Sequence, residues 1–163
     1  MCNKNKDFVH LHAHTHFSVQ DALPSPTQYA KKLSEMGFRA GAITDHGRIS
    51  GAIEFVSACR KESTPENKIK PILGCEFYTY HDRFDKNPVV IDGKKRRPKH
   101  NHLTLLAQNE KGYRNLLKMA SIGAEEGYYY EPTIDRDVLS RHSEGVIAMS
   151  GCMGSEVSQL LLR

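Results

Sequence analysis

The chain has 163 residues, 39% of them hydrophobic, which is enough apolar material for one buried core. Its formal net charge of +4 is compatible with a phosphate-bearing partner but too weak to establish one. There is no apolar run of about eighteen residues and no signal peptide at the start, so we expect no membrane span and a cytoplasmic protein. The four cysteines form no C-x-x-C pair, which agrees with a reducing compartment.

The N-terminal part of the chain carries clear signals for a strand and a helix. Apolar and polar residues alternate over 9–16, which predicts a half-buried strand. A loop with Asp21 follows. Ser25 and Pro26 are typical of a helix start, and Gly37 is typical of a helix end.

Strand and helix signals continue to alternate along the rest of the chain. The further predicted elements are, in chain order, a strand over 39–44, a helix over about 51–61, a strand over 70–80, a strand over 103–107, a helix after Asn109, a Gly/Tyr-rich loop, a short helix over 135–142, a strand over 145–149 and a helix from Ser155. The helical residues expected to face inward are Tyr29, Ala30, Leu33, Met36, Ile53, Val56, Cys59, Tyr113, Leu116, Leu117 and Ala120. We interpret Asp135 and Asp137 as structural, because acidic residues favour a helix start.

Residues 81–101 form a long polar excursion between two predicted strands. Within it, 94–97 are consecutive basic residues. We expect an exposed basic loop or a small hairpin with its turn over 89–93. The basic run over 94–99 is either a solvated loop or an electrostatic contact for a DNA backbone.

The alternation of short apolar strands with helices predicts an α/β fold with a parallel sheet, and five strands without a Rossmann glycine pattern favour a barrel. His14, Asp21, Asp45, His46 and Cys152 follow the carboxyl ends of predicted strands, which share one rim in a parallel barrel. Polar residues within or at the start of strands, Glu76 and His102, fit this rim less well. Five strands are too few to close a barrel, so we expect either an open sheet or, preferably, an incomplete copy of a longer domain.

Four histidines at every second position, His10, His12, His14 and His16, are the most unusual feature of the sequence. Alternate side chains of an extended strand point to the same face, and neutral imidazole is a common ligand of zinc and related ions. The candidate metal ligands are His12, His14, Asp21, His46, Glu76, His102 and Cys152. One zinc needs three or four protein ligands, so this set is sufficient for two or three ions, an arrangement that cleaves phosphoesters.

Several runs resemble the motifs of the polymerase and histidinol phosphatase (PHP) family. These runs are 8–18 with Asp21, 42–47 with 51–55, and 70–76. The runs 102–107 with 112–116, and 143–152, resemble the polymerase branch of that family, in which the domain is N-terminal in bacterial replicative polymerase subunits. The resemblance covers the chain apart from the first six residues and 81–101.

The resemblance implies that residues 1–163 are the N-terminal portion of a distorted (β/α)7 PHP barrel, with about five of its strands present. It implies up to three divalent ions, zinc or manganese, held by the seven ligands named above. His12, His14, Glu76 and His102 would act through a metal-activated water, and Asp45 would orient a neighbouring imidazole. His10 and His16 match no family ligand. The family's last motif, Asp-x-His, is absent because the sequence ends at Arg163.

By the same resemblance, the parent protein is a DNA-directed DNA polymerase whose partners are primer–template DNA and other replicase subunits. The implied activity of the domain is phosphoester hydrolysis, with 3′–5′ exonuclease proofreading in some members. The polymerase site itself is not in this chain. Two alternatives stay open: a free-standing phosphatase for a small phosphomonoester such as histidinol phosphate, and a non-catalytic, metal-stabilised scaffold.

Overall fold

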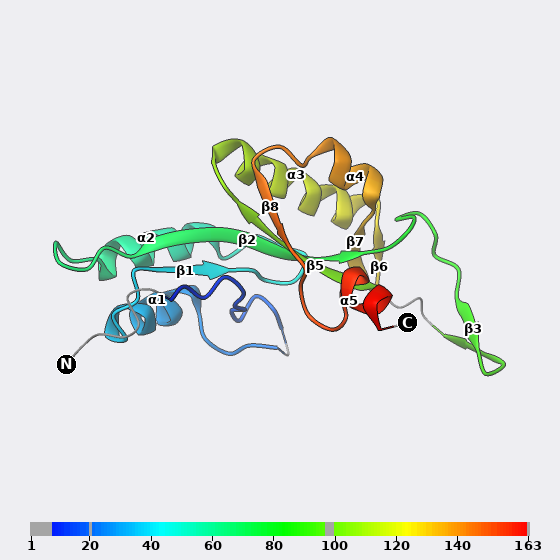
Figure 1. Cartoon of the computed structure of the whole chain (residues 1–163), viewed down its shortest axis with the longest axis horizontal. Coiled ribbons are helices and arrows are strands. Elements are labelled where there is room, and N and C mark those ends of the chain that lie inside the picture. The colour runs from blue at the N-terminus through cyan, green and yellow to red at the C-terminus, as the bar shows by residue number, and fades with distance from the viewer. Residues whose placement is uncertain (1–7, 20, 97–99, 163) are drawn as a thin grey trace.

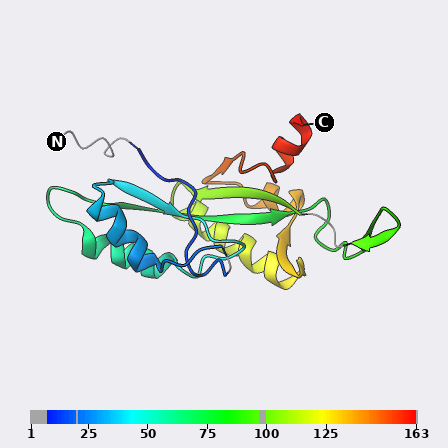
Figure 2. The same cartoon turned by 90° about the horizontal axis from the view of Figure 1, so that it is seen from below.

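The computed structural model describes residues 8–19, 21–96 and 100–162. It is an α/β fold in which a long sheet runs through the molecule (Figure 1). The elements are α1 (Pro26–Glu35), β1 (Ala40–Ile43), α2 (Ala52–Glu62), β2 (Lys70–Thr79), β3 (Val89–Ile91), β4 (Lys94–Arg96), β5 (Asn101–Ala107), α3 (Glu110–Glu125), β6 (Tyr128–Tyr129), β7 (Glu131–Ile134), α4 (Arg136–Arg141), β8 (Val146–Met149) and α5 (Glu156–Leu161). Helices α1, α2 and α3 lie on one side of the sheet and α5 lies on the other (Figure 2). Within the described residues, no helix is long and apolar enough to cross a membrane.

The ten-residue strand β2 is the centre of the sheet. Its first part pairs in parallel with β1, and its last two residues pair in parallel with β7. Its other pairing, with β5, is antiparallel and runs from Gly74↔Leu106 to Thr79↔Asn101. Strand β8 is antiparallel to β5. The α/β class and the incomplete sheet are therefore confirmed, but the fully parallel sheet is wrong. The difference lies in the connection between β2 and β5. A parallel pair needs a crossover to the other end of the sheet, whereas the connection from β2 to β5 begins and ends at the same end of the sheet.

Two apolar clusters make up the core. The first lies between α1, α2 and β1 and includes Phe55, which is fully buried. The second lies between α3 and the sheet and includes Leu116 and Met119. The predicted inward positions of Ile53 and Leu117 are wrong, because these side chains are 79% and 41% exposed. The buried face of α2 instead carries Phe55, Ala58 and Cys59.

Helix α1 begins and ends as predicted. Ser25 is the N-cap and forms a capping box with Gln28, and Pro26 is the first helical residue. Gly37 has a φ of 73°, which a glycine adopts without strain. Met36, however, is 41% exposed, because it is the C-cap and lies beyond the buried face of the helix.

The histidine-rich segment is extended but is not the strand that we predicted. It makes one isolated bridge, His10↔Gly41, and accepts two backbone hydrogen bonds from β1 and the residue after it. The N–H of Ala42 donates to the carbonyl of His10, and that of Thr44 to the carbonyl of Ala13, both at 2.8 Å. The segment thus lies along β1 without a continuous ladder. The Gly/Tyr-rich loop expected after α3 contains the short antiparallel pair β6–β7.

The excursion contains a two-stranded hairpin, β3–β4, which projects from the body of the molecule (Figures 1 and 2). Its turn is narrower than the predicted 89–93. Asp92 and Gly93 have φ values of 51° and 70°, as two-residue hairpin turns require. Arg97 and Lys99, the end of the basic run, lie outside the described residues.

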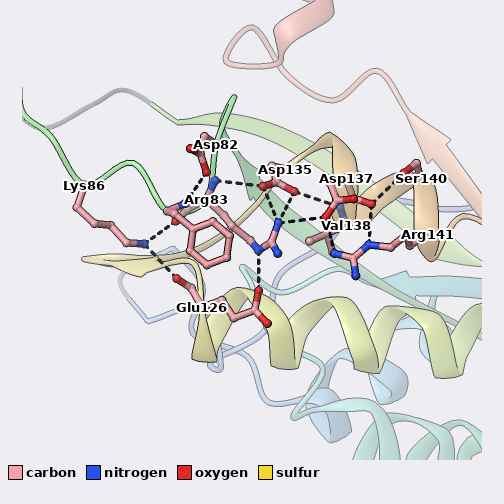
Figure 3. Close-up of polar contacts among 10 residues, drawn as sticks. Asp82, Arg83, Lys86, Glu126, Asp135, Asp137, Val138, Ser140 and Arg141 are labelled. Atoms are coloured by element: carbon pink, nitrogen blue, oxygen red, sulfur yellow. Dashed lines mark hydrogen bonds and ion pairs between the residues drawn. The ribbon is translucent and has the colours of Figure 1, made fainter.

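An ion-pair cluster around Arg83 fastens the start of this excursion to the body (Figure 3). The Arg83 side chain is 9% exposed and donates hydrogen bonds to Asp135 at 2.8 Å and to Glu126 at 2.7 Å. Asp135 also accepts from the backbone N–H of Val138 as the N-cap of α4. Burial alone would raise the Asp135 pKa, but these hydrogen bonds and the Arg83 charge hold it below its ordinary value. Asp135 therefore has the structural role that we predicted.

Replacing Asp135 by Asn should lower the free energy of unfolding at pH 7 by about 3 kcal/mol, because Arg83 loses its buried counter-charge. A carboxyl with a depressed folded-state pKa stabilises the protein above its unfolded-state pKa. That contribution is lost as the pH falls through the folded-state value. Urea unfolding should therefore show a difference between wild type and D135N that shrinks below about pH 4. Asp137→Asn, at a 60% exposed carboxylate of the same cluster, is the matched control and should change stability by less than about 1 kcal/mol.

Candidate metal centre

An open cavity of about 830 Å³ lies where the histidine-rich segment meets the sheet. The residues that line it are His12, His14, Asp21, His46, Glu76, Tyr78, His100, His102, Glu131 and Cys152. They come from the N-terminal segment and the loop after it, the residues after β1 and β8, strands β2, β5 and β7, and His100 just before β5. All seven candidate ligands named from the sequence thus face one cavity, although they are distributed over 140 residues of chain.

Glu76 is at the centre of the cavity wall, with its side chain 3% exposed. Its Oε2 lies 2.5 Å from His12 Nε2 and 3.1 Å from His14 Nε2, and its Oε1 lies 2.7 Å from His102 Nδ1. Burial opposes ionisation, but the three imidazoles hold the pKa of Glu76 well below its usual range. Glu76 is therefore a carboxylate with neighbours on both oxygens.

The candidate ligands form two groups that share this carboxylate. His12 and His14 make the first group with Glu76, and His46 and His102 make the second. Within each group the ligand atoms all lie within 4.8 Å of one another. A carboxylate placed between two sets of imidazoles is a donor set that suits a pair of divalent ions.

His46 provides the clearest sign that a cation fits here. Its Nδ1 is buried without a hydrogen-bond partner among the described residues, and it lies 3.9 Å from Glu76 Oε2. A buried nitrogen without a partner is unfavourable unless another ligand satisfies it. Burial also lowers the pKa of His46, which favours the neutral imidazole that binds metals.

Asp21 and Cys152 are at the edge of this arrangement. Asp21 Oδ2 lies 2.9 Å from His46 Nε2. Cys152 is exposed, and its Sγ accepts a hydrogen bond from the N–H of Gly154 at 3.3 Å. Neither residue belongs to the two close groups. His10, which matches no family ligand, packs instead on Phe38 with a centroid distance of 5.2 Å.

The hydrogen bonds of Asp45 bear on its predicted role in orienting a neighbouring imidazole. It is 2% exposed and accepts hydrogen bonds from the backbone and hydroxyl of Thr15 and from the hydroxyl of Ser18, at 2.7–2.8 Å. The Ser18 oxygen in turn lies 3.3 Å from His14 Nδ1 and accepts from the N–H of His46 at 3.1 Å. Because Ser18 donates its one proton to Asp45, it accepts from His14 Nδ1, which leaves His14 Nε2 facing Glu76. Asp45 therefore acts on His14 through Ser18.

Sequence reasoning missed Tyr78, His100 and Glu131 as cavity residues. Period-two alternation could have identified the first two, because Tyr78 follows Glu76 by two positions and His100 precedes His102 by two. His100 is 8% exposed, and its Nδ1 lies 3.4 Å from Glu131 Oε2. No signal was available for Glu131, because its strand was expected to be a loop.

These features define an α/β domain with a cluster of candidate metal ligands. The model of the PHP domain matches residues 10–163, and the chain belongs to this family. DNA polymerase III subunit alpha of Chlamydia trachomatis is 43% identical over 158 residues, which are 95% of this chain and 12% of the relative. The same subunit of Aquifex aeolicus is 37% identical over 150 residues, 91% of this chain and 12% of the relative. The chain thus spans about an eighth of the length of these relatives.

Two solved structures are also similar. A putative metal-dependent phosphoesterase from Bifidobacterium adolescentis has a TM-score of 0.47 and 18% identity, with 71% of this chain and 32% of that chain covered. An amidohydrolase from Chromobacterium violaceum, solved with sulfate and without metal, has a TM-score of 0.49 and 19% identity, with 72% and 33% covered.

Replacing Ser18 by Ala should lower the free energy of unfolding by about 1–3 kcal/mol, because Asp45 loses a donor and the N–H of His46 loses its acceptor in a buried site. Chemical denaturation at neutral pH measures the change. Ser121→Ala is the matched control, since Ser121 is exposed on α3 and bonds only the preceding turn of its helix. The control should change stability by less than about 0.5 kcal/mol. Equal losses in both variants would contradict the role of Ser18.

Proposed function

We propose that the protein is a metal-dependent phosphoesterase domain from the alpha subunit of a bacterial replicative DNA polymerase III. In this proposal residues 1–163 are the N-terminal portion of the PHP domain. The observation that carries the proposal is Glu76, a buried carboxylate shared by two groups of imidazoles in one open cavity. Membership of the PHP family and the polymerase relatives support it.

The two groups assign the ligands of two ions. His12 and His14 would hold one with Glu76, and His46 and His102 would hold the other with the same carboxylate. Asp21, beside His46, and Cys152 are available to a third. Zinc and manganese both suit these ligands. When bound, such ions supply an activated water and neutralise charge on a phosphate.

The residues of the chain prepare the site for this chemistry. Ser18 accepts from His14 Nδ1, so His14 Nε2 is turned toward Glu76. Asp45 holds Ser18 in place, and burial keeps His46 neutral. We assign catalysis to His12, His14, Glu76 and His102 as ligands, with Asp45 as a positioning residue.

We further propose that the substrate is the 3′ end of a DNA strand, so that the domain is a 3′–5′ exonuclease. The resemblance to polymerase subunits supports a polynucleotide over a small phosphomonoester. Primer–template DNA and other replicase subunits are then the partners in the parent polymerase, and the cytoplasm is the compartment. A scaffold without turnover is the alternative that the following experiment separates.

Purified protein should bind zinc or manganese in calorimetric titration, and His12→Ala should weaken the binding at least tenfold, because the first group loses a ligand. His16→Ala is the matched control: it lies on the same segment, is exposed and is not among the cavity residues. Absence of metal binding in wild type would refute the proposed metal site.

The same variants test turnover. Release of nucleotides from a 3′-labelled primer should require the metal, disappear in H12A and persist in H16A. Metal binding without release, on DNA and on a phosphomonoester, would favour the scaffold. Release from the phosphomonoester alone would favour the phosphatase.

The basic hairpin should contribute to DNA binding. Lys94, Lys95 and Arg96 are exposed and pair with no carboxylate among the described residues. The hairpin is inserted between β2 and β5, the two strands that carry the cavity residues Tyr78 and His102. Reversing the three charges (K94E, K95E, R96E) should lower DNA affinity about tenfold and reduce the slope of log K against log salt by about 2–3.

A matched control reverses three exposed charges on the helices, Arg60, Lys61 and Lys118. Fluorescence anisotropy with a labelled primer–template measures both variants over a salt series. If the two variants lose affinity equally, the contribution of the hairpin is only that of net charge.

A further inference from the structure

Tyr78 packs its ring against two of the candidate metal ligands. It is stacked on His46 with a centroid distance of 5.3 Å and an interplanar angle of 15°. It also meets His102 in an edge arrangement at 5.1 Å and 89°. His46 and His102 are the two imidazoles of the second group, so one aromatic side chain contacts both.

The ring of His46 is stacked on a second neighbour as well. His14 lies at a centroid distance of 4.4 Å and an interplanar angle of 13°, so the His46 ring is nearly parallel to both His14 and Tyr78. A rotation of the His46 ring would break contacts with both neighbours. Aromatic pairs have such preferred geometries, so this stack restricts the direction in which the buried Nδ1 of His46 points.

The backbone fixes the place of Tyr78 in this arrangement. It is two residues after Glu76 on β2, so the two side chains emerge on the same face of the strand. It is also directly opposite His102 in the antiparallel pairing of β2 with β5. The sheet therefore sets Tyr78, Glu76 and His102 relative to one another before any cation binds.

We propose that Tyr78 is a positioning residue for the second group: its ring fixes the orientation of His46 and His102 and thereby sets the affinity of the cation that they share with Glu76. This inference rests on the proposed metal site. A partner that orients a metal-binding imidazole typically changes affinity tenfold or more. Tyr78 would do so with a ring face and a ring edge in place of the usual hydrogen bond.

The first test is calorimetric titration of the protein with Mn²⁺. Tyr78→Leu and Tyr78→Met remove the flat ring but keep apolar bulk. Each should weaken the binding of the ion held by the second group about tenfold. Tyr78→Phe keeps the ring and should stay within about twofold of wild type. Tyr80→Leu is the matched control, because Tyr80 directly follows β2 and contacts His81 and His100, which are not candidate ligands. Wild-type affinities in Y78L and Y78M, or an equal loss in Y80L, would overturn the proposal.

The second test needs no metal. Ring currents from Tyr78 should shift the imidazole C–H resonances of His46 and His102 in the NMR spectrum of the metal-free protein. These resonances should move in Y78L and Y78M, and keep their positions in Y78F and Y80L. If wild type binds no Mn²⁺, the proposed metal site fails, whereas unchanged resonances in Y78L and Y78M refute the positioning role itself.

Discussion

The burial of one carboxylate is the constraint on which the site depends. An ionised carboxylate in the protein interior is strongly unfavourable unless charges or hydrogen bonds compensate it. Glu76 obtains this compensation from His12 and His14 on the N-terminal segment and from His102 on β5. Its ionisation therefore requires three parts of the chain to be folded together. The same side-chain contacts hold the histidine-rich segment against the rest of the molecule, because this segment has few backbone contacts to the sheet.

Strand β2 meets this requirement because of its length. Its first four residues pair with β1, its last two pair with β7, and its opposite edge pairs with β5. Glu76 lies between the two parallel pairings, where the isolated bridge to His46 brings the end of β1 alongside. One strand thus collects ligands from both of its edges. The Arg83 cluster, just beyond its end, holds the outgoing chain against α3 and α4.

Local signals predicted the elements well, and non-local pairing explains most of the errors. Ser25 and Gly37 predicted the ends of α1, because capping depends on residues close in sequence. All seven candidate ligands named from the sequence line one cavity, and the resemblance to a family contributed as much to naming them as their spacing did. The direction of β5 could not be inferred, since strand polarity depends on how the chain returns. Glu131 escaped notice because the short pair β6–β7 leaves no distinct pattern in sequence, whereas the position of Tyr78 two residues after Glu76 was an available signal.

The antiparallel return of the chain has a consequence for how the molecule tolerates change. In a parallel barrel, a ligand at the start of a strand would be at the wrong end of the sheet, but His102 reaches Glu76 because β5 runs opposite to β2. The chain leaves the cavity after Tyr78 and comes back to it at His100, so the excursion begins and ends at the same place in the fold. Beyond the Arg83 cluster, its length can therefore vary by insertion or deletion without displacing any ligand. This makes the hairpin the natural place in the molecule for a tag, a fused peptide or an evolved contact.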